Sequence, residues 1–428
     1  MIALRKLTTA CAGARLWRGM VTEAVHGRVY AVPADDAAPA GVINLEGIGK
    51  EYLDAASREA LTPHLDALAA EHFQGMVAAP IPAFSLPAAA AIASGADATG
   101  HGLIGSLLPP ALPLPAAEWT PQAVAQMRTP PDGGPPSVLE ALAGAGVDVA
   151  LIAAKPDHAN VLRGSLPDAA VAMTAGGSGD TSIAALDEAV AAVKRGVGVF
   201  LACASSAIPH MAAPDDAAAL EYLAGVDARI GELRELDCQL VVTSGHSVNW
   251  KISYDETPRV TYLAPLVAHL EPLGILLPIC DPHTELHAGL GGMAHIYLRP
   301  GLARDRGALI DAMRVLREAP GTHAVMDRET AATSLKLPAE SIGDLVVLAD
   351  LDSVLAGEPP AADAPVLQRK NLRSTGSIYE TNVPMIVGRE LTDVRATSLT
   401  RGQYFTSDAF DLLLNDASDA DTTERAWM

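Results

Sequence analysis

The chain of 428 residues carries 30 Lys and Arg against 51 Asp and Glu, a formal net charge of −21, and 49% of its residues are hydrophobic. This apolar share excludes a disordered chain, and the negative charge argues against general binding to nucleic acid or to an anionic membrane. No apolar segment reaches the roughly 18 uncharged residues that a membrane span requires. Because only 4% of residues are aromatic, we expect a core of Ala, Val and Leu.

The two ends of the chain and its cysteines bear on the cellular compartment. Residues 1–24 are expected to form a disordered leader, with Met20 as an alternative start. We do not expect a signal peptide, because the basic beginning of this segment lacks the continuous apolar stretch that a signal peptide requires. The acidic residues 416–428 are expected to form a frayed tail. The cysteines form no CxxC pair, which is typical of reduced thiols in the cytoplasm. They are Cys11, Cys203, Cys238 and Cys280.

Predicted strands and helices alternate through the first part of the chain. In order, they are a strand at 41–45, a helix at 52–72, a strand at 76–83, a helix at 87–94, a helix from 137 to 143, a strand at 147–153, a helix at 182–195, a strand at 197–203, a helix at 215–236 and a strand at 239–243. This alternation predicts an α/β fold with a mostly parallel sheet between helices. In such sheets chemistry takes place beyond the carboxyl ends of the strands.

Two later regions depart from this rhythm. The proline-rich segment 107–136 is expected to be a surface excursion. Residues 251–365 read as a small α+β cap or insert, and the core then comprises 25–250 and 366–415. Within the insert, the predicted elements are a strand at 294–298, a helix at 304–318, a strand at 323–326, a helix at 328–335 and a strand at 343–349.

Ser85 and His246 are the best single candidates for catalytic residues. Ser85 stands at a strand-to-helix turn, where backbone amides and the helix dipole favour a phosphate or carboxylate. A plain helix cap is the more common role of such a serine, by about three to one. His246 follows a strand in Ser244-Gly245-His246, which suits a base, a metal ligand or an ordinary buried histidine.

A second group of candidates has weaker support. Acidic and histidine side chains recur at every second residue in one segment, and in an extended chain they would share one face and could bind a metal ion. They are Asp281, His283, Glu285 and His287. A polar loop is the plainer reading, by about three to two. Lys155 at a strand end could hold an anionic substrate, although a solvated lysine is the default. Walker A, GxGxxG and HExxH motifs are absent from the sequence.

The order of eight motifs resembles the phosphonoacetate hydrolase family of the alkaline phosphatase superfamily, from about residue 26 to residue 414. They are GVINLEGIGKEYLDAA (41–56), AFSLPAAAAIASG (83–95), HGLIG (101–105), LIAAKPDH (151–158), VVTSGHS (241–247), LPICDPHTELHAGLGG (277–292), LPAESIGDLVVLAD (337–350) and LRSTGSIYETNVPMIV (372–387). The resemblance implies an alkaline-phosphatase-like fold with a small α+β cap.

The resemblance also implies cleavage of a carbon–phosphorus bond by two zinc ions and a threonine nucleophile. At the first metal site, the family's Asp, Thr and Asp-His pair correspond to Glu46, Ser85, Gly245 and His246. Glycine cannot ligate, so the other three make a possible single site, which is the minimum for a catalytic zinc. At the second site the family's ligands correspond to Ser205, Pro209 and Thr375, and we expect that site to be lost unless His210 takes part.

The substrate contacts of the family are only partly kept. Lys155 matches one of two carboxylate-binding lysines, while Asp157 replaces the other. The residue at the phosphoryl-binding Asn position is Ser106. His287 matches one of a pair of histidines, and Leu286 replaces its partner.

Three functions follow, in order of preference. The first is a diverged hydrolase of the C–P or phosphoester class, acting through Ser85 and His246 on a small anionic metabolite, which is a phosphonate, a phosphate ester or a carboxylate. It would use one divalent metal ion, zinc first, or none. Its substrate contacts would be Lys155, Ser106 and His287. The second is an inactive pseudoenzyme or partner protein on the same scaffold, and the third is a genuine phosphonoacetate hydrolase. We expect neither nucleic acid nor membrane as a partner, and a homodimer is compatible with each reading.

Overall fold

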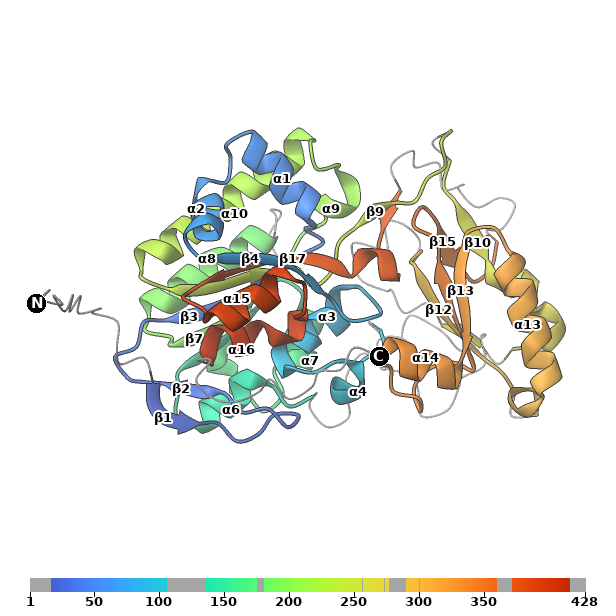
Figure 1. The fold of residues 1–428 in the computed structure, drawn as a ribbon, viewed down its shortest axis with the longest axis horizontal. Helices are drawn as coiled ribbons and strands as arrows, with labels where there is room; N and C mark the ends of the chain where they lie inside the picture. Colours follow the sequence, from blue (N-terminus) through green and yellow to red (C-terminus); the bar gives the residue numbers. More distant parts are fainter. Residues whose placement is uncertain are drawn as a thin grey trace, which may run out of the picture.

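The computed structural model describes residues 17–105, 135–174, 181–255, 257–272, 274–276, 290–299, 301–359 and 372–415 (Figure 1). A seven-stranded sheet with the order β4-β17-β8-β3-β7-β5-β6 forms its centre. All of its strands run parallel except β17, which is antiparallel to both neighbours. The strands are β3 (Ala40–Glu46), β4 (Phe73–Ala78), β5 (Val149–Ala153), β6 (Val171–Met173), β7 (Val199–Ser205), β8 (Gln239–Thr243) and β17 (Asn382–Gly388). The predicted α/β fold with a mostly parallel sheet is confirmed.

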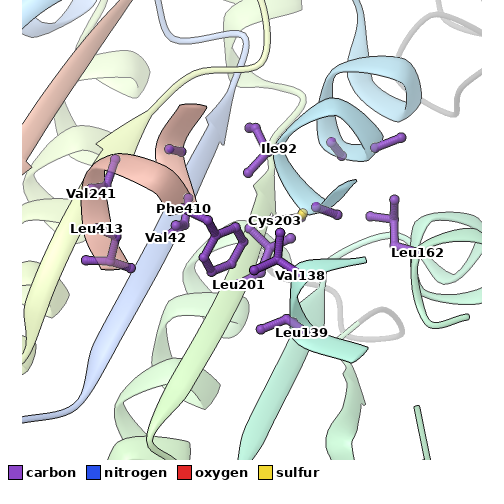
Figure 2. Close-up of a cluster of buried hydrophobic side chains, with 14 of the residues drawn as sticks. Val42, Ile92, Val138, Leu139, Leu162, Leu201, Cys203, Val241, Phe410 and Leu413 are labelled. Carbon is purple, nitrogen blue, oxygen red and sulfur yellow. The ribbon is translucent and has the colours of Figure 1, made fainter. Parts of the chain in front are cut away.

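Helices cover both faces of this sheet because successive strand residues point to opposite sides. Val42 packs on one face, in a cluster that Figure 2 shows around Phe410. The helices of this face are α3 (Ser85–Ser94), α6 (Val138–Gly144) and α16 (Ala409–Leu414). Ile43, the next residue of β3, packs on the other face. The helices there are α1 (Lys50–Arg58), α2 (Pro63–Glu71), α8 (Thr181–Lys194) and α10 (Ala217–Glu235).

Two predicted elements have different boundaries. The helix expected over 52–72 is two helices, α1 and α2, because Ala60 adopts a left-handed conformation (φ 54°) and Pro63 begins a new helix that it could not continue from within. The strand expected over 76–83 is β4, which starts at Phe73 and ends at Ala78. It stops before Pro80, since proline has no N–H group to donate to a neighbouring strand.

The predicted insert contains a four-stranded antiparallel sheet with the order β11-β12-β14-β13 (Figure 1, right). The strands are β11 (Gly274–Leu276), β12 (Met293–Tyr297), β13 (Thr322–Asp327) and β14 (Leu345–Ala349). Helix α13 (Arg306–Glu318) packs on one face and α14 (Arg328–Leu335) on the other. The strand–helix–strand–helix–strand series expected here is confirmed. The α14 cluster also includes Ala98 and Ile104 of the core, so the insert packs against the core.

The remaining elements are short. The strands are β1 (Trp17–Val21), β2 (Ala31–Pro33), β9 (Asn249–Trp250), β10 (Val260–Tyr262), β15 (Val354–Ala356) and β16 (Arg373–Ser374). The helices are α4 (Ala98–His101), α7 (Pro156–Leu162), α9 (Ile208–Met211), α11 (Leu263–Val267) and α15 (Asp393–Thr400). The 3₁₀ helices are η2 (Asp168–Ala170), η3 (Ala268–Leu270), η4 (Leu302–Arg304), η5 (Ile378–Glu380) and η6 (Thr406–Asp408).

Two of the strand pairings bear on the predicted leader and on the predicted borders of the insert. β1 pairs with β2, so the expectation of a disordered leader over 1–24 is wrong for 17–21. β9 pairs with β16, which places the chain entering the insert beside the chain leaving it. The division into a core and an insert stays a prediction. Among the described residues, no helix is both long and apolar enough to cross a membrane.

Candidate functional site

Polar residues gather where four neighbouring parallel strands end. Glu46 ends β3 and Ser205 ends β7, while Lys155 follows β5 and His246 follows β8. These strands are adjacent in the order β8-β3-β7-β5. Their carboxyl ends meet at one edge of the sheet, which is the place for chemistry in such a fold. All four side chains are buried.

Ser85 is the first residue of α3, two residues earlier than the predicted start at Pro87. The N-cap residue is Phe84, which has an extended backbone, so Ser85 does not have the cap position that was the plainer alternative. Its hydroxyl lies at the N-terminus of a helix, where the positive end of the dipole attracts anions. The side chain is buried, and the hydroxyl has a specific partner, Lys155.

Lys155 joins two of the predicted site residues. Its Nζ atom donates to Ser85 Oγ at 2.9 Å and lies 3.1 Å from Glu46 Oε2. A buried ammonium group is costly unless it is paired and hydrogen-bonded, and here both conditions are met. The sequence suggested that Lys155 would hold a substrate. In the structure its amine contacts the predicted nucleophile and the predicted ligand, and its contact with a substrate stays a prediction.

His158 belongs to the site, although the sequence analysis did not select it. It lies in α7, three residues after Lys155, and its Nδ1 is 3.2 Å from Glu46 Oε1. The available signal was its place within LIAAKPDH, one helical turn beyond Lys155. Burial raises the pKa of Glu46, but the charges of Lys155, His158 and His246 outweigh burial and hold that pKa well below its usual range. Glu46 is therefore a carboxylate.

His246 is fixed in position through its Nδ1 atom. That nitrogen lies 3.1 Å from the carbonyl oxygen of Ser247 and 3.2 Å from Thr375 Oγ1. A carbonyl oxygen can only accept, so we infer that Nδ1 carries a proton; whenever the ring is neutral, its lone pair therefore lies on Nε2. Thr375 also donates to the carbonyl oxygen of Ala83. Thr375 thus orients His246 from a position where the resemblance implies a zinc ligand.

Pro209, another of the second-site positions, contacts a buried arginine. The carbonyl oxygen of Pro209 accepts from Arg373 Nε at 2.9 Å and from the Tyr52 hydroxyl at 3.2 Å. The Arg373 guanidinium also lies 4.6 Å from the ring centroid of Trp250. His210 is buried in α9, with its ring centroid 6.3 Å from that of His246. A guanidinium group, rather than a carboxylate, therefore contacts α9 at Pro209.

The residues of the site do not fit two zinc ions. Within the described ranges, no group of three or more His, Cys, Asp and Glu side chains is placed to hold a metal ion. At Gly245 a Cβ atom would lie 2.7 Å from Ala88 Cβ and 3.3 Å from Asn44 Oδ1, so an aspartate has no room there without movement. Several predicted residues lie outside the described ranges. They are Ser106, Asp281, His283, Glu285, Leu286 and His287.

The close packing at Gly245 leads to a stability prediction. Gly245→Ala is expected to lower the free energy of unfolding by about 1–3 kcal/mol, because the new methyl group overlaps Ala88 in a buried helix. Urea denaturation measures the change. Gly144→Ala is the control, since a Cβ there meets nothing within 4 Å. The double variant Ala88→Gly/Gly245→Ala should recover part of the loss, and an unaltered single variant would contradict the prediction.

Comparison with known proteins adds two kinds of finding. Residues 41–362 match the family described as type I phosphodiesterase / nucleotide pyrophosphatase. The chain also resembles the crystal structure of phosphonoacetate hydrolase from Sinorhizobium meliloti 1021 in complex with phosphonoacetate. The identity is 25% and the TM-score 0.77, covering 91% of this chain and 97% of that one.

More distant structures share the fold. Murine ectonucleotide pyrophosphatase / phosphodiesterase 5 is 14% identical with a TM-score of 0.57, covering 87% of this chain and 93% of that one. The human protein is 13% identical with a TM-score of 0.59, and the comparison covers 90% of this chain and 97% of the human chain.

Proposed function

Because the chain belongs to the type I phosphodiesterase / nucleotide pyrophosphatase family of the alkaline phosphatase superfamily, we propose that it is a diverged hydrolase that acts through Ser85. Its substrate would be a small anionic metabolite, a phosphate ester or a phosphonate. The likeness to phosphonoacetate hydrolase supports this reaction class. One observation carries the proposal: the Ser85 hydroxyl stands at the start of α3 and accepts a hydrogen bond from a buried lysine.

In the proposed reaction, the Ser85 oxygen forms a bond to phosphorus while the bond to the leaving group breaks. His246, with its lone pair on Nε2, would accept the serine proton and pass it to the departing atom. Water then attacks the phosphoryl-serine and gives one proton through His246 to Ser85, which releases the phosphorus acid and restores the serine. The helix dipole and Lys155 stabilise the charge on the substrate oxygens.

A hydrolysis assay tests this function. Purified protein is incubated with p-nitrophenyl phosphate, bis-p-nitrophenyl phosphate and phosphonoacetate, with and without divalent metal ions. Turnover of at least one substrate is expected, with loss to background in Ser85→Ala because no other hydroxyl then occupies the start of α3. Ser57→Ala, in the last turn of α1, is the control and should keep the activity. Turnover that survives in Ser85→Ala would contradict the role of Ser85.

The second candidate is a pseudoenzyme or partner protein on the same scaffold. It is favoured by the positions of Gly245, Pro209 and Thr375, which supply no metal-binding side chain of the usual kind. This candidate predicts no hydrolysis of any of the three substrates under any metal condition. A genuine phosphonoacetate hydrolase stays third, and hydrolysis of phosphonoacetate alone in that assay would favour it. We further place the protein in the cytoplasm, from the dispersed cysteines.

A further inference from the structure

The Lys155 nitrogen contacts two of the residues that correspond to first-site metal ligands in related enzymes. It lies 2.9 Å from Ser85 Oγ and 3.1 Å from Glu46 Oε2. A cation therefore already bridges the predicted nucleophile and the predicted carboxylate ligand. The other carboxylate oxygen, Oε1, is 3.2 Å from His158 Nδ1. Both oxygens of Glu46 thus have cationic or polar neighbours from the chain itself.

The charge and packing around Lys155 favour its position between Glu46 and Ser85. Glu46 is buried and is held as a carboxylate, so a positive charge beside it is electrostatically favoured. The neighbouring position Gly245, where the resemblance gives an aspartate ligand, is closed by Ala88 and Asn44. A divalent ion between Glu46 and Ser85 would have to displace the ammonium group and would repel it at short range.

A purely structural ion pair is the alternative, and the chain offers a comparison. Lys251 and Glu380 form another buried pair, with Nζ and Oε1 2.9 Å apart. The Lys251 amine also donates to a backbone carbonyl, that of Leu351. Lys155 instead donates to the hydroxyl of Ser85, at the N-terminus of a helix on the catalytic edge of the sheet. That contact gives Lys155 a chemical role that Lys251 does not share.

We propose that the Lys155 ammonium group replaces the first metal ion of this site. It holds the Ser85 oxygen in place and supplies the positive charge that an anionic substrate needs, so the site operates without a bound divalent ion. This inference rests on the proposed function for its catalytic part. Its metal-binding part depends only on the geometry of Lys155, Glu46 and Ser85.

Metal content of the wild-type protein is the first test. After expression in medium supplemented with zinc, manganese and iron, elemental analysis should find clearly less than one metal ion per chain. Any hydrolysis should withstand incubation with EDTA and should not rise when zinc is returned. A stoichiometric metal ion, or activity that EDTA removes and zinc restores, would overturn the inference. This measurement needs no variant, so it does not depend on whether a variant folds.

Zinc titration of variants is the second test, read by competition with a chromogenic chelator. Lys155→Ala leaves the Glu46 charge without its nearest cation, so its affinity for zinc should rise at least about tenfold over wild type. Lys155→Arg keeps the positive charge, so its affinity for zinc should not exceed that of wild type. It should also keep partial hydrolytic activity. Lys50→Ala removes an exposed lysine paired with Asp54 elsewhere in the chain, and its affinity for zinc should stay that of wild type. A Lys155→Ala protein that folds but binds zinc no more tightly than wild type would contradict the inference.

The two proposals fail in different ways. If no substrate is turned over, the proposed hydrolase function fails, while the zinc titration still decides whether Lys155 occupies the place of a metal ion. If turnover depends on Ser85 and also requires zinc, the hydrolase function stands and the inference about Lys155 fails.

Discussion

Lys251→Met is expected to lower the free energy of unfolding by about 3–5 kcal/mol, because it leaves the buried Glu380 carboxylate without its counter-charge. Both side chains of this pair are fully buried, and their charged atoms are 2.9 Å apart. The methionine fills much of the space of the lysine stem but cannot donate a hydrogen bond. The uncompensated charge, rather than lost packing, therefore dominates the cost.

The Lys251–Glu380 pair connects parts of the chain that lie far apart in the sequence. Lys251 follows β9, where the chain leaves the core, and Glu380 ends η5 on the chain that returns to it. The Lys251 amine also donates to the carbonyl oxygen of Leu351, within the predicted insert, at 2.7 Å. One ammonium group thus ties together the outgoing chain, the insert and the returning chain. Its loss should loosen the junction as well as the core.

Urea denaturation followed by circular dichroism measures the effect of Lys251→Met. Lys50→Met is the matched control: Lys50 pairs with Asp54 at 2.5 Å, but both side chains are about half exposed. An exposed pair of this kind contributes at most about 1 kcal/mol. If the two substitutions cost the same, burial does not set the worth of the Lys251 pair, and the prediction is wrong.

Acidification from pH 7 to pH 4 is expected to destabilise the protein by up to about 3 kcal/mol for each of two buried histidines, at 1.36 kcal/mol per pKa unit. Burial lowers the pKa of His101 and of His295 from 6.5 to about 3; for His101, nearby Asp97 opposes and His26 adds to this effect. In each ring Nδ1 accepts a backbone N–H, from Leu103 and from Gly343 respectively. Protonation of Nδ1 would break that hydrogen bond.

The direction of the effect follows from proton binding. Between pH 6.5 and about 3 the unfolded chain binds a proton at each histidine and the folded chain does not. The free energy of unfolding therefore falls as the pH falls through this window. Glu46 acts at lower pH. Because its folded pKa lies below the ordinary value of 4.5, its contribution is present above pH 4.5 and is lost as the pH falls toward the folded pKa.

Free energies of unfolding in urea at pH 7, 5.5 and 4 measure this dependence. His101→Asn and His295→Gln keep a hydrogen-bond acceptor but do not titrate, so each should flatten the decline, and the two effects should add. His323→Gln is the control, because His323 is exposed. An unchanged pH dependence in both buried-histidine variants would show that these rings are not the cause.

Local patterns in the sequence predicted much of the fold. The strand at 239–243 and the helix at 328–335 have the expected boundaries in β8 and α14. Ser137 and Glu140 form a capping box at the start of α6, where the sequence predicts a helix start. The same reasoning merged α1 and α2, because the apolar period continues past Pro63. The break between the two helices is set by the backbone geometry of the turn that joins them, and the apolar periodicity carries no information about that turn.

Part of the candidate site could likewise be predicted from the sequence, and part could not. Glu46, Ser85, Lys155 and His246 could be found from their sequence motifs and from the rule that the carboxyl ends of parallel strands meet at one edge. The sequence by itself therefore determined the family, the sheet and the edge where polar residues gather, because these depend on short-range patterns and on motif order.

Only the tertiary structure decided what those residues touch. The Lys155 amine lies at the end of a flexible side chain, and its contacts with Ser85 and Glu46 join residues that are 70 and 109 positions away along the chain. His158 and Thr375 joined the site for the same reason. Such contacts depend on which strands are neighbours and on how much space remains after packing, and a buried charge takes the partner that this packing brings within reach.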